Sequence, residues 1–238
     1  RLTDVRPMAE ISAQASVQGR RAPVPELLAS PHENMVVDVS DYGQVERACQ
    51  GMDAAINLTV LRPDLEKAFA VNMTGAYNIA RAAVACGLKR LIHTGPFHTT
   101  LEHDADYWND HRLVDDIPLH PGGDLYALTK YLGGEITRVF AERHGLEVLV
   151  FLFCGFRPRR IEPAERGKGT GPFIVSWEDA GESFLYGLRA AQMPSPYETF
   201  FICAKTPDRK HRVDKAKRLL GWEAKDTFEE LLRKPPGP

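Results

Sequence analysis

A tyrosine and a lysine four residues apart, Tyr126 and Lys130, are the side chains whose types and spacing best suit proton transfer. They open a helical pattern that spans 125–144, and a spacing of four places both on one helical face. Because a nearby ammonium stabilises a phenolate, we expect Lys130 to lower the pKa of Tyr126 towards working pH. Such a tyrosine can exchange a proton with an alcohol or a ketone, and the lysine can also bind a ribose hydroxyl. The alternative is an exposed lysine beside a half-buried tyrosine, and the surrounding elements decide between the two.

Short apolar runs alternate with longer helical patterns over the first 153 residues. The expected strands are 35–39, 54–58, 90–93 and 148–153, and the expected helices are 41–50, 64–86 and 125–144. Strands that are apolar on both faces and alternate with helices are typical of a parallel sheet covered on both sides. The sequence therefore predicts an α/β fold with a doubly wound, Rossmann-like parallel sheet.

This alternation breaks after residue 153. Residues 154–172 contain three prolines and four glycines, so we expect a loop there. The elements expected beyond it are strands at 173–175 and 199–203 and helices at 178–191, 214–220 and 227–232. We assign 1–153 to a dinucleotide-binding core. We assign 154–238 mainly to a small C-terminal substrate-binding cap, some segments of which can return to the core.

The composition narrows the range of partners. The chain has 238 residues, 43% hydrophobic and 26% charged, with a formal net charge of −2, so nothing global attracts nucleic acid or an anionic membrane. The longest near-continuous apolar run, 148–156, is too short to span a bilayer. Four scattered cysteines without metal-binding spacing favour a reduced, cytoplasmic compartment. We expect a small-molecule substrate, no nucleic-acid partner and no membrane.

Two clusters of polar side chains have more than one interpretation. The loop 94–124 is rich in histidine and acidic residues: His98, His103, Asp104, Asp106, His111 and His120. Their spacing fits no standard ligand set, so we predict no metal site and interpret the segment as a solvated acidic loop with one histidine reaching the substrate. The second cluster is Arg157, Arg159 and Arg160, which either bind a carboxylate or phosphate or form a solvated basic loop.

The motifs along the chain, taken in order, resemble those of the extended short-chain dehydrogenase/reductase family, also called NAD-dependent epimerase/dehydratases. The resemblance covers most of the chain. The matching segments are Asp38-Val39 and 53–58 (third and fourth strands), 72–79 (the N-x-x-G-x-x-N helix), 87–92 (the approach to the fifth strand), 126–135 (the catalytic helix), Asp179-Ala180 and 217–222 (the closing L-G-[WY] helix). Residues 1–7 and Ser176-Trp177 are most similar to the uronate dehydrogenase branch.

The resemblance implies a role for each matching position. Tyr126 would be the acid/base, Lys130 would bind the nicotinamide ribose, and Thr94 would be a third catalytic residue. Asp4 would bind the adenosine ribose, which favours NAD as the cofactor. Arg6 and either Arg20 or Arg21 lie nearby, so NADP stays an alternative cofactor. The remaining cofactor-binding positions are Asp38, Val39, Leu58, Thr59, Val60, Asn72, Phe153 and Cys154.

One position departs from the family pattern. The family usually places Ser or Thr after the fifth strand to hydrogen-bond the substrate oxygen, and Gly95 stands there in this sequence. Thr94, Thr99 or His98 can supply that donor. The substrate contacts we expect are His98, Thr99 and Arg157.

The function that the resemblance implies is an NAD-dependent oxidoreductase acting on a sugar or sugar acid. It also implies a homodimer formed through 64–86 and 125–144. The alternatives are an NAD-dependent sugar or sugar-nucleotide epimerase and a non-catalytic dinucleotide-sensing protein. Gly95 favours the sensing protein, whereas retention of both Tyr126 and Lys130 favours an enzyme.

The first residues correspond to the second strand of this family. No G-x-x-G-x-x-G turn occurs in the chain, and that turn is what cradles a pyrophosphate at a helix N-terminus. We therefore expect one strand–turn–helix unit, about 25–30 residues long in total and with a glycine-rich turn, to belong before residue 1. We also expect the 238 residues alone to bind NAD weakly or not at all.

Overall fold

Four parallel strands form the centre of the molecule. The computed structural model describes residues 1–17, 28–62, 64–99, 114, 120–169, 171, 173–207 and 211–232, apart from the side chains of 15–17 and His98. The central sheet has the order β3 (Ala54–Asn57), β4 (Arg90–Pro96), β5 (Glu147–Phe153) and β8 (Tyr197–Phe201). Two shorter parallel pairs accompany it: β1 (Leu2–Asp4) with β2 (Asn34–Val36), and β6 (Gly155–Arg157) with β7 (Ile174–Ser176). The predicted parallel α/β architecture is confirmed, and the carboxyl ends of β3, β4 and β5 meet at one edge.

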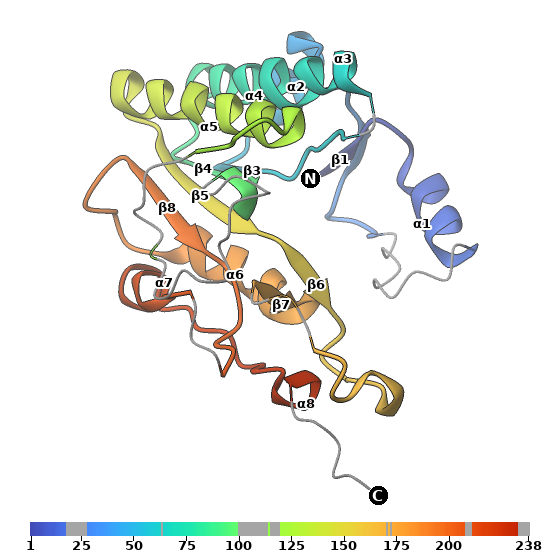
Figure 1. Cartoon of the computed structure of the whole chain (residues 1–238). Coiled ribbons are helices and arrows are strands. Elements are labelled where there is room, and N and C mark those ends of the chain that lie inside the picture. Colours follow the sequence, from blue (N-terminus) through green and yellow to red (C-terminus); the bar gives the residue numbers. More distant parts are fainter. Residues whose placement is uncertain are drawn as a thin grey trace, which may run out of the picture.

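Helices cover both faces of this central sheet (Figure 1). The helices on one face are α2 (Tyr42–Cys49), α4 (Gly75–Ala85) and α5 (Leu125–His144), and α6 (Trp177–Arg189) lies on the other. Successive side chains of β4 enter two different cores, because Leu91 packs with the helices of the first face and Ile92 packs beside α6. This is why the strand is a continuous apolar run. The remaining helices are α1 (Met8–Val17), α3 (Leu65–Ala68), α7 (Asp214–Leu220) and α8 (Glu229–Leu232). None of the helices within the described ranges is long and apolar enough to cross a membrane.

Helix α5, which carries the tyrosine–lysine pair, begins and ends at defined capping residues. The Asp124 carboxylate accepts a hydrogen bond from the Tyr126 backbone N–H at 2.9 Å, which satisfies a free donor of the first turn. Gly145 ends the helix with φ of 69°, a left-handed conformation that favours glycine. The predicted range 125–144 is therefore confirmed, and the position of Tyr126 in the first turn is fixed.

Three segments differ from the sequence prediction. The helix predicted over 64–86 is interrupted by a π-helical segment, Phe69–Thr74, between α3 and α4. The segment predicted as loop, 154–172, contains β6, which pairs with β7. The strand predicted over 199–203 begins earlier, as β8, and pairs with β5 in the central sheet. Each difference depends on a tertiary partner, which local sequence patterns do not contain.

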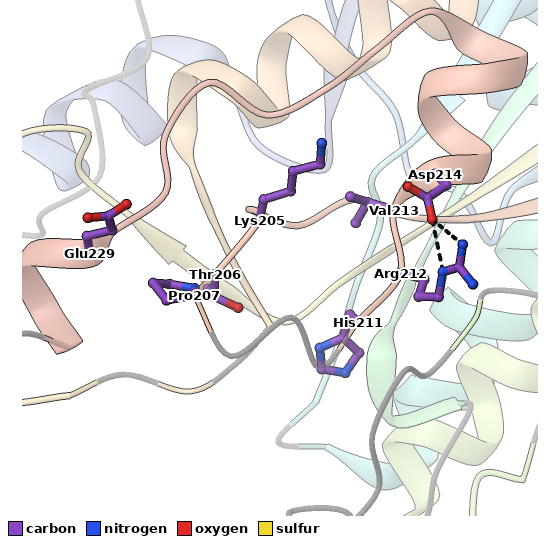
Figure 2. Close-up of a pocket in the computed structure, with 8 residues that line it drawn as sticks. All are labelled: Lys205, Thr206, Pro207, His211, Arg212, Val213, Asp214 and Glu229. Carbon is purple, nitrogen blue, oxygen red and sulfur yellow. Dashed lines mark hydrogen bonds and ion pairs between the residues drawn. The ribbon is translucent and has the colours of Figure 1, made fainter.

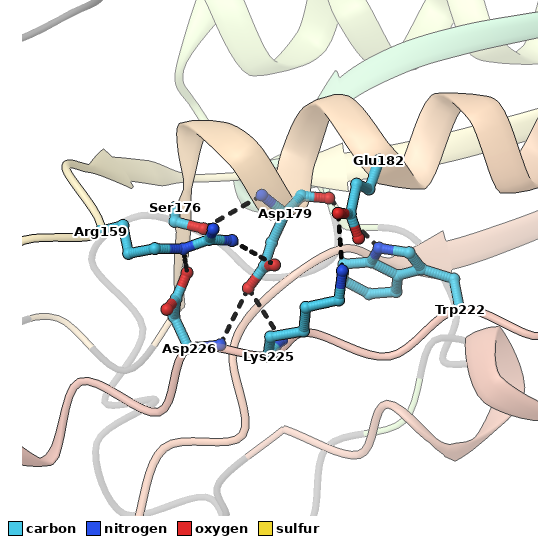
Figure 3. Close-up of polar contacts among 7 residues, drawn as sticks. All are labelled: Arg159, Ser176, Asp179, Glu182, Trp222, Lys225 and Asp226. Atoms are coloured by element: carbon cyan, nitrogen blue, oxygen red, sulfur yellow. Dashed lines mark hydrogen bonds and ion pairs between the residues drawn. The ribbon is translucent and has the colours of Figure 1, made fainter.

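A buried carboxylate, Asp179, ties the C-terminal segment to α6 (Figure 3). Its Oδ2 accepts the backbone N–H groups of Lys225 at 2.9 Å and Asp226 at 3.0 Å. Its Oδ1 accepts from Arg159 Nη2 at 3.3 Å, and its backbone carbonyl accepts from Trp222 Nε1 at 3.2 Å. Asp179 is fully buried, so these contacts fix residues 222–226 against the start of α6.

Close contact between α5 and the π-helical segment makes Gly133 a sensitive position. A Cβ added to Gly133 would overlap the Asn72 carbonyl oxygen and lie 3.3 Å from the Ala76 Cβ. We expect Gly133→Ala to lower the free energy of unfolding by about 1–3 kcal/mol, measured by urea denaturation. Gly181→Ala is the matched control, because its Cβ would meet nothing within 4 Å in α6. The control should be neutral or stabilising by about 0.5–1 kcal/mol, and equal effects of the two would contradict the packing argument.

Candidate active site

Tyr126 and Lys130 lie on one face of α5, but their side chains have different partners. Lys130 is 4% exposed, and its Nζ donates to the Thr59 carbonyl at 3.1 Å. The Tyr126 hydroxyl instead lies 3.4 Å from Arg62 Nη2, and the Arg62 guanidinium carbon is 4.7 Å from the centroid of the Tyr126 ring. A second cation that was not among the sequence candidates therefore faces the tyrosine.

The electrostatics of Tyr126 differ from the sequence expectation. Burial raises the pKa of Tyr126 above its ordinary value, and the charge and hydrogen bond of Arg62 act against that rise. The expectation that Lys130 lowers this pKa is wrong for this structure, because burial outweighs the neighbouring charges and the lowering cation is Arg62. Burial, reinforced by the charge of Arg62, lowers the pKa of Lys130 to about 7. Lys130 can therefore gain and lose a proton near neutral pH.

The depressed pKa of Lys130 predicts a pH dependence of stability. The folded-state pKa of Lys130, about 7, lies below its ordinary value of 10.5, so the unfolded chain binds more protons between these values and stability rises with pH. We expect Lys130→Met to remove this rise. The difference in free energy of unfolding between the parent and the variant should therefore grow by about 2 kcal/mol in favour of the parent from pH 7 to pH 9. Urea denaturation of both proteins across this range measures the difference. A difference that stays constant with pH would contradict the low pKa of Lys130.

A buried hydrogen-bond network joins the carboxyl end of β3 to the middle of β4. Asn57 Nδ2 donates to His93 Nδ1 at 3.1 Å, and Asn57 Oδ1 accepts from the Thr59 backbone N–H at 3.0 Å and from its hydroxyl at 2.7 Å. The Thr94 hydroxyl donates to the Asn57 carbonyl at 2.8 Å. Burial and the charge of Lys130 hold the pKa of His93 well below its ordinary value, so His93 is neutral. This hydrogen-bond network fixes the loop at 58–61. It also engages the hydroxyl of Thr94, a predicted catalytic residue.

Asn72, predicted to bind the cofactor, holds together the elements around the pair. Its amide donates to the Leu61 carbonyl at 3.0 Å and to the Thr129 hydroxyl at 3.0 Å, and its Oδ1 accepts from the Leu61 backbone N–H at 3.1 Å. Asn72 is 1% exposed. It therefore links the loop after β3 to α5, which places Arg62 against Tyr126.

The predicted adenosine-binding positions meet at the ends of β1 and β2. The Val37 backbone N–H donates to the Asp4 carbonyl at 2.8 Å, which sets Asp4 beside the start of the segment holding Asp38 and Val39. Asp4 Oδ1 accepts from the Arg6 backbone N–H at 3.0 Å, and Asp38 Oδ1 accepts from the Ser40 backbone N–H at 2.9 Å. Each carboxylate keeps a second oxygen that can accept from a ribose hydroxyl.

The other predicted cofactor-binding positions lie in the loop after β3 and at the end of β5. Leu58 and Val60 are 59% and 46% exposed, so the loop after β3 presents apolar side chains to solvent. Phe153 is buried and stacks on Phe156 with ring centroids 5.3 Å apart. Cys154 is exposed and lies close enough to Tyr126 and Arg62 for their charges to influence one another.

These residues fit the nucleoside ends of NAD. The Lys130 ammonium has three N–H donors, and one of them binds the Thr59 carbonyl. The other two can donate to ribose hydroxyls. Leu58 and Val60 offer apolar contacts for flat rings. The second oxygens of Asp4 and Asp38 suit a second ribose.

The predicted substrate contacts are dispersed. The Thr99 hydroxyl is buried and donates to the Pro96 carbonyl at 2.9 Å, and the side chain of His98 lies outside the described residues. The loop residues His103, Asp104, Asp106 and His111 also lie outside them. Arg157 lines a cavity of about 220 Å³ whose other walls include Arg160, Glu165 and Leu231.

The larger of the two cavities is lined by residues of the C-terminal part of the chain (Figure 2). It measures about 780 Å³ and is lined by Lys205, Thr206, Pro207, His211, Arg212, Val213, Asp214 and Glu229. Arg212 and Asp214 pair with each other across its rim at 2.6 Å. Neither of these two cavities has Tyr126 or Lys130 in its lining.

Comparison with known proteins places this chain in a family. The model of the NAD dependent epimerase/dehydratase family matches residues 11–164, more than half of the chain. L-arabinose 1-dehydrogenase (NAD(P)(+)) of Haloferax volcanii is 27% identical over 217 residues, covering 84% of this chain and 85% of the relative. A uronate dehydrogenase of Agrobacterium fabrum is 31% identical over 201 residues, covering 82% of this chain and 70% of the relative. The solved structure of a mutant uronate dehydrogenase from Agrobacterium tumefaciens complexed with NAD has a TM-score of 0.70 at 18% identity, covering 100% of this chain and 90% of that one.

The chain therefore belongs to the NAD dependent epimerase/dehydratase family. The family resemblance inferred from the motifs is confirmed. The relatives named above are dehydrogenases.

Sequence reasoning missed Arg62 and the Asn57–His93 pair. Arg62 follows an apolar strand and precedes Pro63, so it has the pattern of an ordinary loop cation. Asn57 ends β3, and His93, its partner in register, ends the strand predicted at 90–93 but lies in the middle of β4. Polar residues at the ends of neighbouring parallel strands were the available signal for this pair.

Proposed function

We propose that this protein is an NAD-dependent dehydrogenase that oxidises a hydroxyl group of a sugar or sugar acid. The observation that carries the proposal is the placement of Tyr126 and Lys130 in the first turns of α5, beside the ends of β3, β4 and β5. The Lys130 ammonium donates to the loop that also presents Leu58 and Val60. The membership in the NAD dependent epimerase/dehydratase family supports the same chemistry.

Each side chain has a definite task in the proposed reaction. Tyr126 accepts the proton of the substrate hydroxyl, and Lys130 binds ribose hydroxyls and holds the cofactor beside Tyr126. Bound NAD supplies the hydride acceptor, so the hydroxyl carbon loses a hydride and the hydroxyl oxygen loses a proton. Arg62 opposes the effect of burial on Tyr126, which favours the phenolate that receives this proton. Thr94 and Asn72 fix the surrounding loops.

A cofactor and substrate screen tests the proposal. The protein is mixed with NAD or NADP, each up to millimolar concentration, and with a panel of aldoses and hexuronates while the absorbance of reduced nicotinamide is followed. We expect net reduced cofactor in proportion to the sugar consumed. Interconversion of two sugars without net reduced cofactor would establish an epimerase instead, and cofactor binding without any change in sugar would favour a sensing protein.

We further propose a cytoplasmic homodimer that associates through α4 and α5. Exposed apolar side chains on these helices support it, because Tyr77 is 42% exposed and Val139 is 46% exposed. Tyr77 packs edge-on against Phe140 with centroids 5.7 Å apart, which joins the two helices into one apolar surface. The four free cysteines agree with a reducing compartment. Light scattering of the purified protein measures the oligomeric state.

A further inference from the structure

Arg62 is a cation of the site, and no carboxylate among the described residues balances its charge. It is exposed, it lies in the loop after β3, and its Nη2 is 3.4 Å from the Tyr126 hydroxyl. Within the described part of the chain, no Asp or Glu forms an ion pair with it. A guanidinium has five N–H donors in a planar fork, and only one faces Tyr126. The remaining donors can bind a planar anion beside the reacting oxygen.

The charges around Tyr126 favour an anion as well. Lys130 is the second cation near the site, and it stands below the loop at Thr59. The nearest acid on α5 is Asp124, and its Oδ1 accepts from the Tyr126 backbone N–H at the helix N-terminus. The α5 N-terminus adds partial positive charge at the same place. The surface therefore carries more positive than negative charge around Tyr126.

We propose that Arg62 binds the carboxylate of a sugar acid whose reacting hydroxyl lies at Tyr126, so that the substrates are sugar acids rather than neutral sugars. This inference rests on the proposed dehydrogenase function and names its substrate class. The relatives leave that class open, because one is named for L-arabinose and the other for a uronate. Arg62 is the residue that would distinguish a sugar acid from a neutral sugar.

A second effect of Arg62 must be separated from carboxylate binding. Its charge also lowers the pKa of Tyr126, so its removal slows proton transfer for every substrate. That loss is the same for a sugar acid and for the matching neutral sugar. The ratio of the two kcat/KM values therefore isolates the contact with the carboxylate.

The test compares substrates that differ only at the carboxylate: D-glucuronate with D-glucose, and D-galacturonate with D-galactose, at saturating NAD. We expect the parent protein to prefer the hexuronate, and we expect Arg62→Gln to lower the hexuronate-to-hexose ratio of kcat/KM by about 10- to 100-fold. Arg62→Lys should restore part of the ratio, because it keeps the charge and loses the planar fork. Arg81→Gln is the matched control. Arg81 lies on α4, and its guanidinium carbon is 3.8 Å from the centroid of the Tyr42 ring on α2, so its loss should leave the ratio unchanged.

Each outcome decides something definite. Equal losses for both substrates in Arg62→Gln would show that Arg62 acts only through Tyr126 and would overturn the proposal. A parent protein that prefers the neutral hexose would overturn it too, while the dehydrogenase function would stand. If neither these sugars nor the wider panel yielded reduced cofactor, the dehydrogenase function would be refuted. The proposal about Arg62 would then fail with it.

Discussion

Tyr126→Phe is expected to lower turnover by about 10³-fold while the fold and the affinity for NAD stay unchanged. The substitution removes one oxygen, the atom that lies 3.4 Å from Arg62 Nη2, and keeps the ring that packs beneath the guanidinium. Without this oxygen, no group in the first turn of α5 can take the proton of the substrate hydroxyl. Steady-state formation of reduced nicotinamide measures the loss, and a fluorescence titration with NAD measures the affinity.

The matched control is Tyr186→Phe, which removes the same atom from a tyrosine on α6 that is 43% exposed. Turnover of this control should equal that of the parent. A Tyr126→Phe variant that keeps more than about a tenth of the parent turnover would show that another group is the base. An equal loss in the control would show that the assay reports general damage.

Asp179→Ala is expected to lower the free energy of unfolding by about 3–5 kcal/mol, the largest stability effect we anticipate. The fully buried carboxylate accepts from two backbone N–H groups and one guanidinium, and alanine leaves these donors without an acceptor (Figure 3). Residues 222–226 would then lose their attachment to α6. Urea denaturation monitored by tryptophan fluorescence suits the measurement, because Trp222 Nε1 donates to the Asp179 carbonyl at 3.2 Å.

Glu182→Gln provides the comparison in the same network. Glu182 pairs with Lys225 Nζ at 2.6 Å, but the two side chains are 34% and 61% exposed, so water screens the pair. Its loss should cost less than about 1 kcal/mol. If the two substitutions had similar effects, Asp179 would not be the attachment point that its burial indicates.

The sequence predicted the elements whose ends carry local signals. Helix α5 begins after Asp124 and ends before Gly145, and both residues act through contacts within a few positions of the chain. Helix α7 ends at Gly221 with φ of 74° for the same reason, and its predicted range 214–220 is confirmed. The apolar runs of β4 and β5 reflect burial on both faces, which is itself a sequence pattern.

The features that the sequence did not predict depend on distant partners. The π-helical segment Phe69–Thr74 packs against α5 at a contact where Gly133 permits close approach, and no local residue pattern encodes that contact. Strand β6 has three residues within a segment rich in glycine and proline, and only its pairing with β7 makes it a strand. Arg62 reaches Tyr126 across 64 residues of sequence, through a loop that the Asn72 amide fixes. The chemistry of the pair was visible in the sequence, whereas its electrostatic partner was not.

Transfer of a labelled hydride is the sharpest test of the proposed dehydrogenase function. A sugar acid carrying deuterium at the carbon that is oxidised is turned over with NAD, and the cofactor and the sugar are then analysed by mass spectrometry. We expect one deuterium in the reduced nicotinamide for each sugar oxidised, with the transfer lost in Tyr126→Phe. Oxidised sugar with no deuterium in the cofactor, or deuterium retained in an epimerised sugar without reduced cofactor, would contradict the proposed dehydrogenase function.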